Sequence, residues 1–204
     1  MDNMKQVILM RHGETAHNKE RIFQSDTVSL SQTGRQQIKD YASTLRKDVE
    51  LIIHSPSTRA LESAEIIAQA IHKPTQESSL LVELQNPPEI RGKSYDDPAA
   101  DKIYQTWLNK LKSPQSLSDS KKENYFDMYN RARKALTEVS RQKESTILAV
   151  SHSEFIRAII AYVLLGDNSN IEQIADVIKR FKLRNACSVT LEYNESKELW
   201  RVAL

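Results

Sequence analysis

Val7-Ile8-Leu9-Met10-Arg11-His12-Gly13-Glu14-Thr15 is the stretch that decides the fold of this chain. Its four leading apolar residues are typical of a strand buried on both faces, as in a parallel sheet. Arg11 and His12 follow where that strand would end, and Gly13 allows the backbone to turn sharply. Open α/β sheets bind their ligands at the carboxyl ends of the strands. We therefore expect this cation and this imidazole to meet an anion there.

Two further strands end near similar side chains. The apolar run 146–150 is followed by His152 and then at once by a predicted helix, whose N-terminal amides would also favour an anion. The shorter run 49–53 leads into a helix with Arg59 in its first turn. A cation there opposes the helix dipole, so Arg59 does not serve helix stability. Its spacing fits either an anion site or a solvated surface arginine.

Apolar spacing predicts helices between these strands. The first is expected from residue 33 to about 46, with Thr33 as N-cap and Gln36 completing a capping box. Residues 74–84 are expected to form a further strand and a loop. Alternating apolar residues around 194–197 predict a C-terminal hairpin. Because strands alternate with helices nearly throughout, the sequence predicts an α/β fold with a largely parallel sheet.

Residues 85–121 interrupt this alternation. Pro87, Pro88 and Gly92 argue against regular structure at 86–94, and a helical stripe follows at 103–111. Residues 113–120 are the most linker-like segment of the chain. We expect one domain over residues 1–204, with 85–121 as a lid-like insertion over the site.

Composition excludes several classes of protein. The chain of 204 residues has 29 basic and 27 acidic residues, so its net charge of +2 gives no global attraction for nucleic acid or an anionic membrane. Cys187 is the single cysteine, which excludes an intrachain disulfide and a multi-cysteine metal site. No apolar run approaches the roughly 20 residues that span a bilayer, and no secretory signal pattern is present. We expect a cytoplasmic protein.

Five segments resemble, in order, the motifs of the histidine phosphatase superfamily, also called phosphoglycerate mutase-like. They are 9–18 with Arg-His-Gly-Glu-Thr, 21–35 with Arg-x-x-Gln and Leu-Ser-x-x-Gly-Arg, 55–60 with Ser-Pro-x-x-Arg-Ala, 80–83, and 150–157 with the second histidine. The resemblance spans nearly the whole chain. It implies a three-layer αβα sandwich, with a mostly parallel central sheet and an antiparallel C-terminal hairpin at its edge.

The resemblance also implies catalytic roles that agree with the residue chemistry. His12 would be the nucleophile and form a phosphohistidine, which divides one difficult displacement into two easier ones. Arg11, Arg59 and His152 would hold the phosphoryl oxygens and stabilise the charge of the transition state.

Three further residues complete the implied site. Asn18 and Gln24 would add neutral hydrogen bonds to the phosphoryl group. Glu83 would protonate the leaving oxygen and then deprotonate the attacking water. No metal and no cofactor is implied, since cationic side chains neutralise the phosphate.

Some positions depart from the family pattern. Ser25 and Ser153 stand where the family usually has glycine, and residues 84–92 replace its Gly-x-x-Glu-Gly segment. The general acid is therefore open between Glu83, which we prefer, and Glu89. The departures also mean that the leaving-group pocket is not inherited from a familiar member.

Three functions remain on sequence grounds. The first is a metal-independent phosphatase that hydrolyses a small phosphorylated substrate. The second is a phosphoglycerate mutase that returns the phosphate to its substrate, although a short insertion favours hydrolysis. The third is a non-catalytic phosphate-binding scaffold, which is disfavoured because the nucleophile, its cationic cage and an acid are all present. The sequence does not predict the substrate or the oligomeric state.

Overall fold

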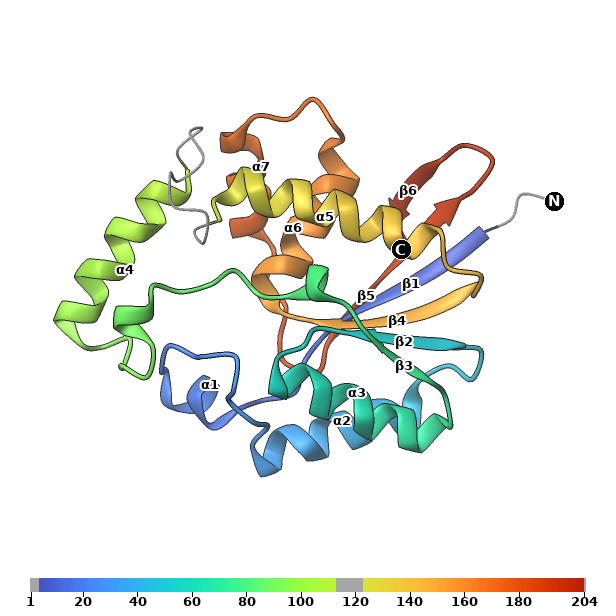
Figure 1. Cartoon of the computed structure of the whole chain (residues 1–204), viewed down its shortest axis with the longest axis horizontal. Coiled ribbons are helices and arrows are strands. Elements are labelled where there is room, and N and C mark those ends of the chain that lie inside the picture. Colours follow the sequence, from blue (N-terminus) through green and yellow to red (C-terminus); the bar gives the residue numbers. More distant parts are fainter. Residues whose placement is uncertain (1–3, 113–122, 204) are drawn as a thin grey trace.

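The structure is a computed structural model that describes residues 4–112 and 123–203, so the predicted linker at 113–120 lies outside the described residues. Its centre is a six-stranded sheet with the order β3-β2-β4-β1-β5-β6 (Figure 1). The strands are β1 (Met4–Arg11), β2 (Leu51–His54), β3 (Thr75–Glu77), β4 (Thr146–Ser151), β5 (Ser188–Asn194) and β6 (Leu199–Val202).

The sheet is parallel on one side of β1 and antiparallel on the other. β1 pairs with β4, β4 with β2, and β2 with β3, all in parallel. β5 runs antiparallel to β1 and forms the C-terminal hairpin with β6. This arrangement confirms the predicted α/β fold, its mostly parallel sheet and its antiparallel edge hairpin.

Helices cover both faces of the sheet (Figure 1). They are α1 (Ala16–Glu20), α2 (Gln32–Thr44), α3 (Thr58–Ile71), α4 (Pro98–Leu111), α5 (Tyr125–Ser140), α6 (Ser153–Leu165) and α7 (Ile171–Arg180), with short 3-10 turns η1 (Ser79–Leu81) and η2 (Pro88–Ile90). Within the part of the chain that is described, no helix is long and apolar enough to cross a membrane.

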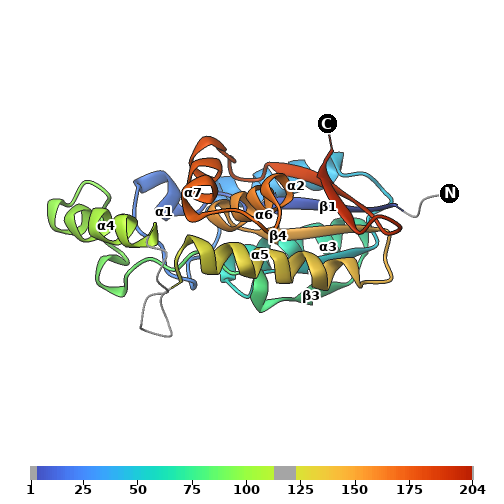
Figure 2. The ribbon, with the colours of Figure 1, turned by 90° about the horizontal axis from the view of Figure 1, so that it is seen from above.

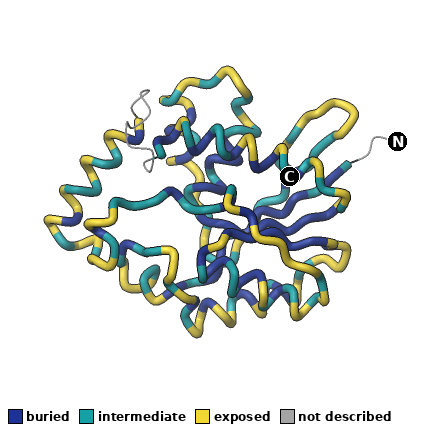
Figure 3. The backbone as a smooth tube through the Cα atoms, viewed as in Figure 1, coloured by how far each residue is buried: buried dark blue, intermediate teal, exposed yellow. Residues whose placement is uncertain are grey.

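β1 explains the three layers, because its side chains alternate between two cores. Ile8 and Met10 pack in the core with α2 and α3. Val7 and Leu9 pack in the core with α5, α6 and α7. A strand buried on both faces needs apolar residues at every position, as its sequence has. Figure 3 shows the buried strands between the exposed outer sides of the helices.

The first long helix has a different N-cap from the one predicted. Ser31 is the N-cap of α2, and its Oγ accepts a hydrogen bond from the Gly34 amide at 2.9 Å. Thr33 lies inside the helix and is exposed. The capping box expected at Thr33 and Gln36 is therefore wrong, because Ser31 already satisfies the amide three residues on.

Other boundaries differ by smaller amounts. β2 begins at Leu51, although Val49 is fully buried beside it. The segment 86–94, expected to be irregular, contains the 3-10 turn η2 with Pro88 as its first residue, a position where a missing amide proton costs nothing. The helix α1 was not predicted. It has no buried residue, and Thr15 and Asn18 hold it by a reciprocal capping box.

The carboxyl ends of the parallel strands face the described part of the predicted insertion. β1 begins at the right of Figure 1, so the ends of β1, β2 and β4 point left toward α1 and α4. Figure 2 shows α4 lying beyond the end of the sheet. Phe23, Ile90 and Ala100 form a small separate core there, and Trp107 of α4 packs against the main core.

Candidate active site

A cavity of about 240 Å³ opens at this end of the sheet. The loop after β1, the first turn of α3, the segment after η1, α4 and the N-terminus of α6 all contribute side chains to it. It brings together six of the residues predicted from the sequence: Arg11, His12, Asn18, Gln24, Arg59 and Glu83.

His12 is buried and held in one tautomer. Its Nδ1 lies 2.7 Å from the carbonyl oxygen of Gly13, and because a carbonyl only accepts, Nδ1 carries the proton. The lone pair therefore lies on Nε2, which accepts a hydrogen bond from Arg59 Nε at 3.2 Å. Burial, followed by the charges of Arg59 and Arg11, lowers the pKa of His12 well below 6.5. The ring is neutral at physiological pH.

His152 lies beside His12, with the two ring centroids 5.2 Å apart. It directly precedes α6, and its Nε2 is 2.9 Å from Ser55 Oγ and 3.2 Å from Ser57 Oγ. Burial, and then the charge of Arg59, lowers its pKa well below 6.5. Its Nδ1 is buried and has no hydrogen-bond partner in the described structure.

Arg11 and Arg59 are anchored by backbone carbonyls. Arg11 ends β1, and its Nη1 donates to the Leu183 carbonyl at 2.7 Å. Arg59 Nη1 donates to the Ser25 carbonyl at 2.8 Å. The Nε of Arg11 is buried without a partner in the described residues. Since buried polar atoms normally have a partner, Arg11 Nε and His152 Nδ1 are candidates to contact a bound anion.

Asn18 and Gln24 are oriented by hydrogen bonds to their side-chain oxygens. Asn18 Oδ1 accepts from the Thr15 amide and from Asn185 Nδ2, each at 3.2 Å. Gln24 Oε1 accepts from Thr15 Oγ1 at 2.9 Å. Each side chain then has its amino group as the donor available to an anion in the cavity.

Glu83 occupies the N-terminus of α6. Its Oε1 accepts from the amides of Leu84 at 2.9 Å and Phe155 at 3.1 Å, and its Oε2 accepts from the amide of Glu154 at 3.2 Å. The acceptor at this helix N-terminus is therefore a carboxyl group of the chain itself. Oε2 accepts one of these bonds, which leaves it a lone pair for a proton.

Glu89, the other candidate acid, lies elsewhere. It is exposed in η2 and is not among the described residues that line the cavity. Of the two alternatives, the structure brings only Glu83 to the cavity. Within residues 4–112 and 123–203, no three side chains of His, Cys, Asp or Glu are grouped as metal ligands.

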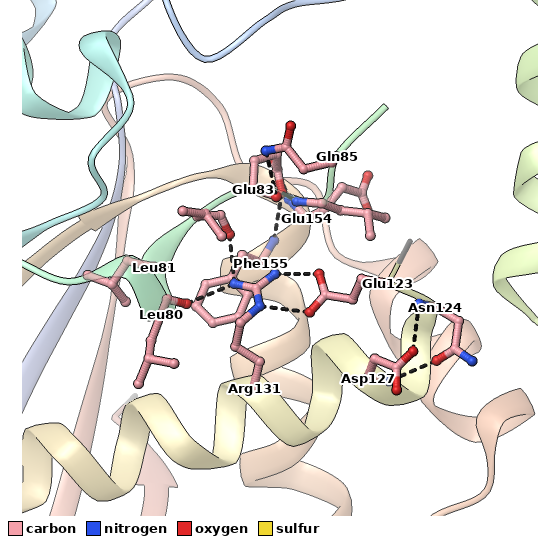
Figure 4. A network of polar contacts seen from close by, with 12 residues as sticks. Leu80, Leu81, Glu83, Gln85, Glu123, Asn124, Asp127, Arg131, Glu154 and Phe155 are labelled. Atoms are coloured by element: carbon pink, nitrogen blue, oxygen red, sulfur yellow. Dashed lines mark hydrogen bonds and ion pairs between the residues drawn. The ribbon is translucent and has the colours of Figure 1, made fainter. Parts of the chain in front are cut away.

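Arg131 of α5 holds the segment that carries Glu83 (Figure 4). Its Nη1 donates to the carbonyls of Leu80 and Val82, both at 2.8 Å, and its guanidinium forms a two-pronged ion pair with Glu123 at 2.7 and 2.6 Å. The guanidinium carbon also lies 4.0 Å from the ring centre of Phe155. Sequence reasoning missed this residue because its partners are distant in the chain.

Glu154 and Arg157 also line the cavity, and neither was assigned a role from the sequence, although Arg157 belongs to the segment that resembles the second-histidine motif. The two side chains form an ion pair. Burial raises the pKa of Glu154 to about 7, against the opposing charge of Arg157. The sequence signal for Glu154 was its position two residues after His152. A glutamate in the first turn of a helix is also common because it stabilises the helix, so this position alone did not indicate a site residue.

Known proteins share this sequence pattern and this fold. Residues 7–203 match the histidine phosphatase superfamily (branch 1). The 2,3-bisphosphoglycerate-dependent phosphoglycerate mutase of Thermoplasma acidophilum is 28% identical over 165 residues, which cover 79% of this chain and 77% of that protein. The uncharacterized phosphatase PhoE of Bacillus subtilis is 27% identical over 202 residues, 98% of this chain and 93% of that one.

Among solved structures, phosphoserine phosphatase from Entamoeba histolytica, in complex with phosphoserine, superposes with a TM-score of 0.77. It is 23% identical, and the match covers 98% of this chain and 95% of that one. At this identity the likeness concerns the fold.

Proposed function

Since this chain belongs to the histidine phosphatase superfamily, we propose that it is a metal-independent phosphatase that hydrolyses a small phosphomonoester through a phosphohistidine. The observation that supports this proposal most strongly is the protonation and hydrogen bonding of His12. Its ring is neutral, its Nδ1 is tied to Gly13, and its Nε2 lone pair faces Arg59. Arg11 Nε and His152 Nδ1, which have no partner among the described residues, support the assignment of both side chains to the phosphoryl oxygens.

In the first step His12 Nε2 attacks phosphorus, a P–N bond forms, and the bond from phosphorus to the ester oxygen breaks. Arg59 exchanges its hydrogen bond with His12 for one to a phosphoryl oxygen, and Arg11 and His152 bind the others. Such positioning and charge stabilisation are most of the catalysis in phosphoryl transfer. Glu83, protonated at Oε2, gives its proton to the leaving oxygen.

In the second step a water molecule attacks the phosphohistidine. The carboxylate of Glu83 takes one proton from the water, an O–P bond forms, and the P–N bond breaks. Inorganic phosphate leaves, and His12 is neutral again with its proton on Nδ1. Asn18 and Gln24 hold the phosphoryl group in both steps through their amino groups. The cations that neutralise the phosphate are side chains, so the cycle requires no metal.

The second candidate is a mutase, which is favoured by the likeness to the Thermoplasma acidophilum protein. A mutase would use the same phosphohistidine and return the phosphoryl group to a second hydroxyl of the substrate. A third candidate is a scaffold that binds phosphate without turnover. The three differ only in the fate of the phosphoryl group.

The test is release of phosphate from p-nitrophenyl phosphate in EDTA. We expect hydrolysis by the native protein and a loss of about a thousandfold or more in the His12→Ala variant, as for a removed nucleophile. The control is His72→Ala, which changes an exposed histidine outside the cavity and should retain full activity. Activity that needs a metal, or that survives His12→Ala, would contradict the proposed function.

A second arm separates the candidates. Interconversion of 3-phosphoglycerate and 2-phosphoglycerate without net phosphate release would favour the mutase. Binding of phosphate without turnover on any phosphomonoester would favour the scaffold.

A further inference from the structure

The cavity has two parts with different chemistry. Arg11, His12 and Arg59 form the phosphoryl part, where the charges of the two arginines act on the histidine. The second part, here called the leaving-group side, consists of Glu83, Tyr104, Trp107, Tyr125, Glu154 and Arg157. Charge interactions join Glu154 to Glu83, Arg157, Tyr104 and Tyr125, and all five residues line the same cavity. Figure 4 shows Glu83 and Glu154 beside each other.

In the described part of the chain, the leaving-group side offers no free cation to an acidic substrate. A bound phosphate engages Arg11 and Arg59, so the remaining cation here is Arg157. That guanidinium is already committed: it pairs with Glu154 and donates to the carbonyls of Ser153 at 3.1 Å and Ile178 at 2.8 Å. Among the described residues that line this side, no cation therefore remains for an acidic group of the substrate.

Arg157 also fixes where the carboxyl group of Glu154 lies. Its bonds to Ser153 within α6 and to Ile178 in the last turn of α7 hold the guanidinium between two helices. Its Nη2 then donates to Glu154 Oε1. The Glu154 side chain lines the cavity and keeps about a third of its surface exposed.

Aromatic rings form another part of the cavity wall. Tyr104 lies 5.0 Å from Phe23 and 5.6 Å from Trp107, measured between ring centroids. All three line the cavity. Such a wall binds the carbon skeleton of a leaving group, and its ring faces attract cations, whereas a carboxylate gains nothing from them.

We propose that Glu154 sets the substrate selectivity of this site, by accepting hydrogen bonds from hydroxyl or ammonium groups of the leaving group and by repelling carboxylates. This inference rests on the proposed function and names the substrate class of the same site. The preferred substrates are phosphomonoesters of alcohols that carry further hydrogen-bond donors. Phosphorylated carboxylic acids such as 3-phosphoglycerate are poor substrates.

The protonation of Glu154 supports this role. Burial raises its pKa to about 7, so the carboxyl group loses its proton within the physiological range. The groups that act on it are Arg157 on its own helix, Glu83 beside it, Arg11 at the end of β1, Tyr95 before α4, Tyr104 on α4 and Tyr125 on α5. Repulsion of a substrate carboxylate should therefore increase as the pH rises through 7.

The test compares glycerol 3-phosphate with 3-phosphoglycerate, which differ by a hydroxymethyl group against a carboxylate. We expect kcat/KM at pH 8 to favour glycerol 3-phosphate by about tenfold or more, as repulsion of a like charge implies. In Glu154→Gln that preference should shrink by about tenfold, because the charge is removed and Arg157 is released. Glu65→Gln, the same charge change on an exposed side chain of α3, is the matched control and should leave the ratio unchanged.

Titration calorimetry in the His12→Ala background gives the dissociation constants of glycerol 3-phosphate and 3-phosphoglycerate without turnover. Their ratio reports the same selectivity. A protein that fails to hydrolyse p-nitrophenyl phosphate but still binds glycerol 3-phosphate better would overturn the proposed function and keep the selectivity. If Glu154→Gln fails to fold, the preference of the native protein between the two ligands tests the inference. Equal or stronger binding of 3-phosphoglycerate by the native site, or an unchanged ratio in a folded Glu154→Gln variant, would overturn this inference.

Discussion

At the scale of single residues, the account depends on how each side chain is held rather than on its presence alone. In the proposed mechanism His12 can act as the nucleophile because Gly13 fixes its tautomer and burial keeps it neutral. Glu83 is available to the leaving oxygen because three backbone amides hold its carboxylate in place. The phosphoryl cage and the acid are thus positioned by different parts of the chain.

The proton transfer assigned to Glu83 can be isolated by the choice of leaving group. Glu83→Gln should lower kcat/KM for glycerol 3-phosphate by about 10²–10⁴, the usual contribution of a general acid. It should lower kcat/KM for p-nitrophenyl phosphate far less, because nitrophenolate leaves without a proton. The ratio kcat/KM reports the step in which the leaving group departs. An equal loss on both substrates would show that Glu83 only supports the structure.

Arg131 should act through Glu83. Arg131→Met removes the bonds to the carbonyls of Leu80 and Val82. We expect kcat/KM for glycerol 3-phosphate to fall about tenfold more than kcat/KM for p-nitrophenyl phosphate, since a small misplacement of a catalytic group is costly. Arg133→Met, on the exposed side of α5, is the matched control and should leave the ratio of the two kcat/KM values unchanged. If Arg131→Met reduces stability and both activities alike, its role is structural only.

At the scale of elements, the loop that carries His12 is pressed against the start of α2. A Cβ atom on Gly34 would lie 2.0 Å from the carbonyl oxygen of Glu14, and one on Gly13 would lie 2.7 Å from the carbonyl oxygen of Gly34. Backbone meets backbone here, so neither segment can yield by moving a side chain. The start of α2 therefore fixes the position of the turn after β1.

This close contact predicts the effect of a single methyl group. Gly34→Ala should cost about 1–3 kcal/mol of unfolding free energy, the usual cost of overpacking, and should lower activity because the turn with His12 is displaced. Thr33→Ala, one residue earlier on the exposed side, should change neither, which also tests whether Ser31 is the cap. Urea denaturation measures the unfolding free energy, and phosphatase rates measure the activity. Full activity in Gly34→Ala would contradict the coupling.

Elements buried on both faces were the ones that sequence could predict. β1 and β4 have continuous apolar runs because helices cover each side of them. The short helix α1 was not predictable from periodicity, because it buries no residue and is held by its cap. Arg11, His12 and His152 could be singled out because they stand at or directly after the end of a strand, and Arg59 because it lies in the first turn of the helix that follows one. Glu154 could not, because its proposed role depends on Tyr104 of α4 and Tyr125 of α5, which only the folded chain brings to the same cavity.

At the scale of the whole molecule, the site makes stability depend on pH. His12 and His152 are buried with pKa values well below 6.5, chiefly through burial. Below pH 6.5 the unfolded chain therefore binds protons that the folded chain does not. Unfolding free energy then falls as the pH falls, by about 1.4 kcal/mol per pH unit for each such histidine.

Urea denaturation between pH 7 and pH 5 measures this dependence. His12→Asn removes one of the two groups and should give a shallower loss of stability on acidification. His72→Asn changes an exposed histidine and serves as the control, with the slope of the native protein. A slope that His12→Asn leaves unchanged would contradict the neutral, buried state assigned to that ring.

The covalent intermediate tests the central claim most directly. Native protein mixed with p-nitrophenyl phosphate in EDTA is quenched in base within one turnover, digested, and analysed by mass spectrometry. The account predicts a phosphoryl group on His12, and none in the His12→Ala variant. Turnover without a phosphorylated histidine, or a phosphoryl group on another residue, would contradict it.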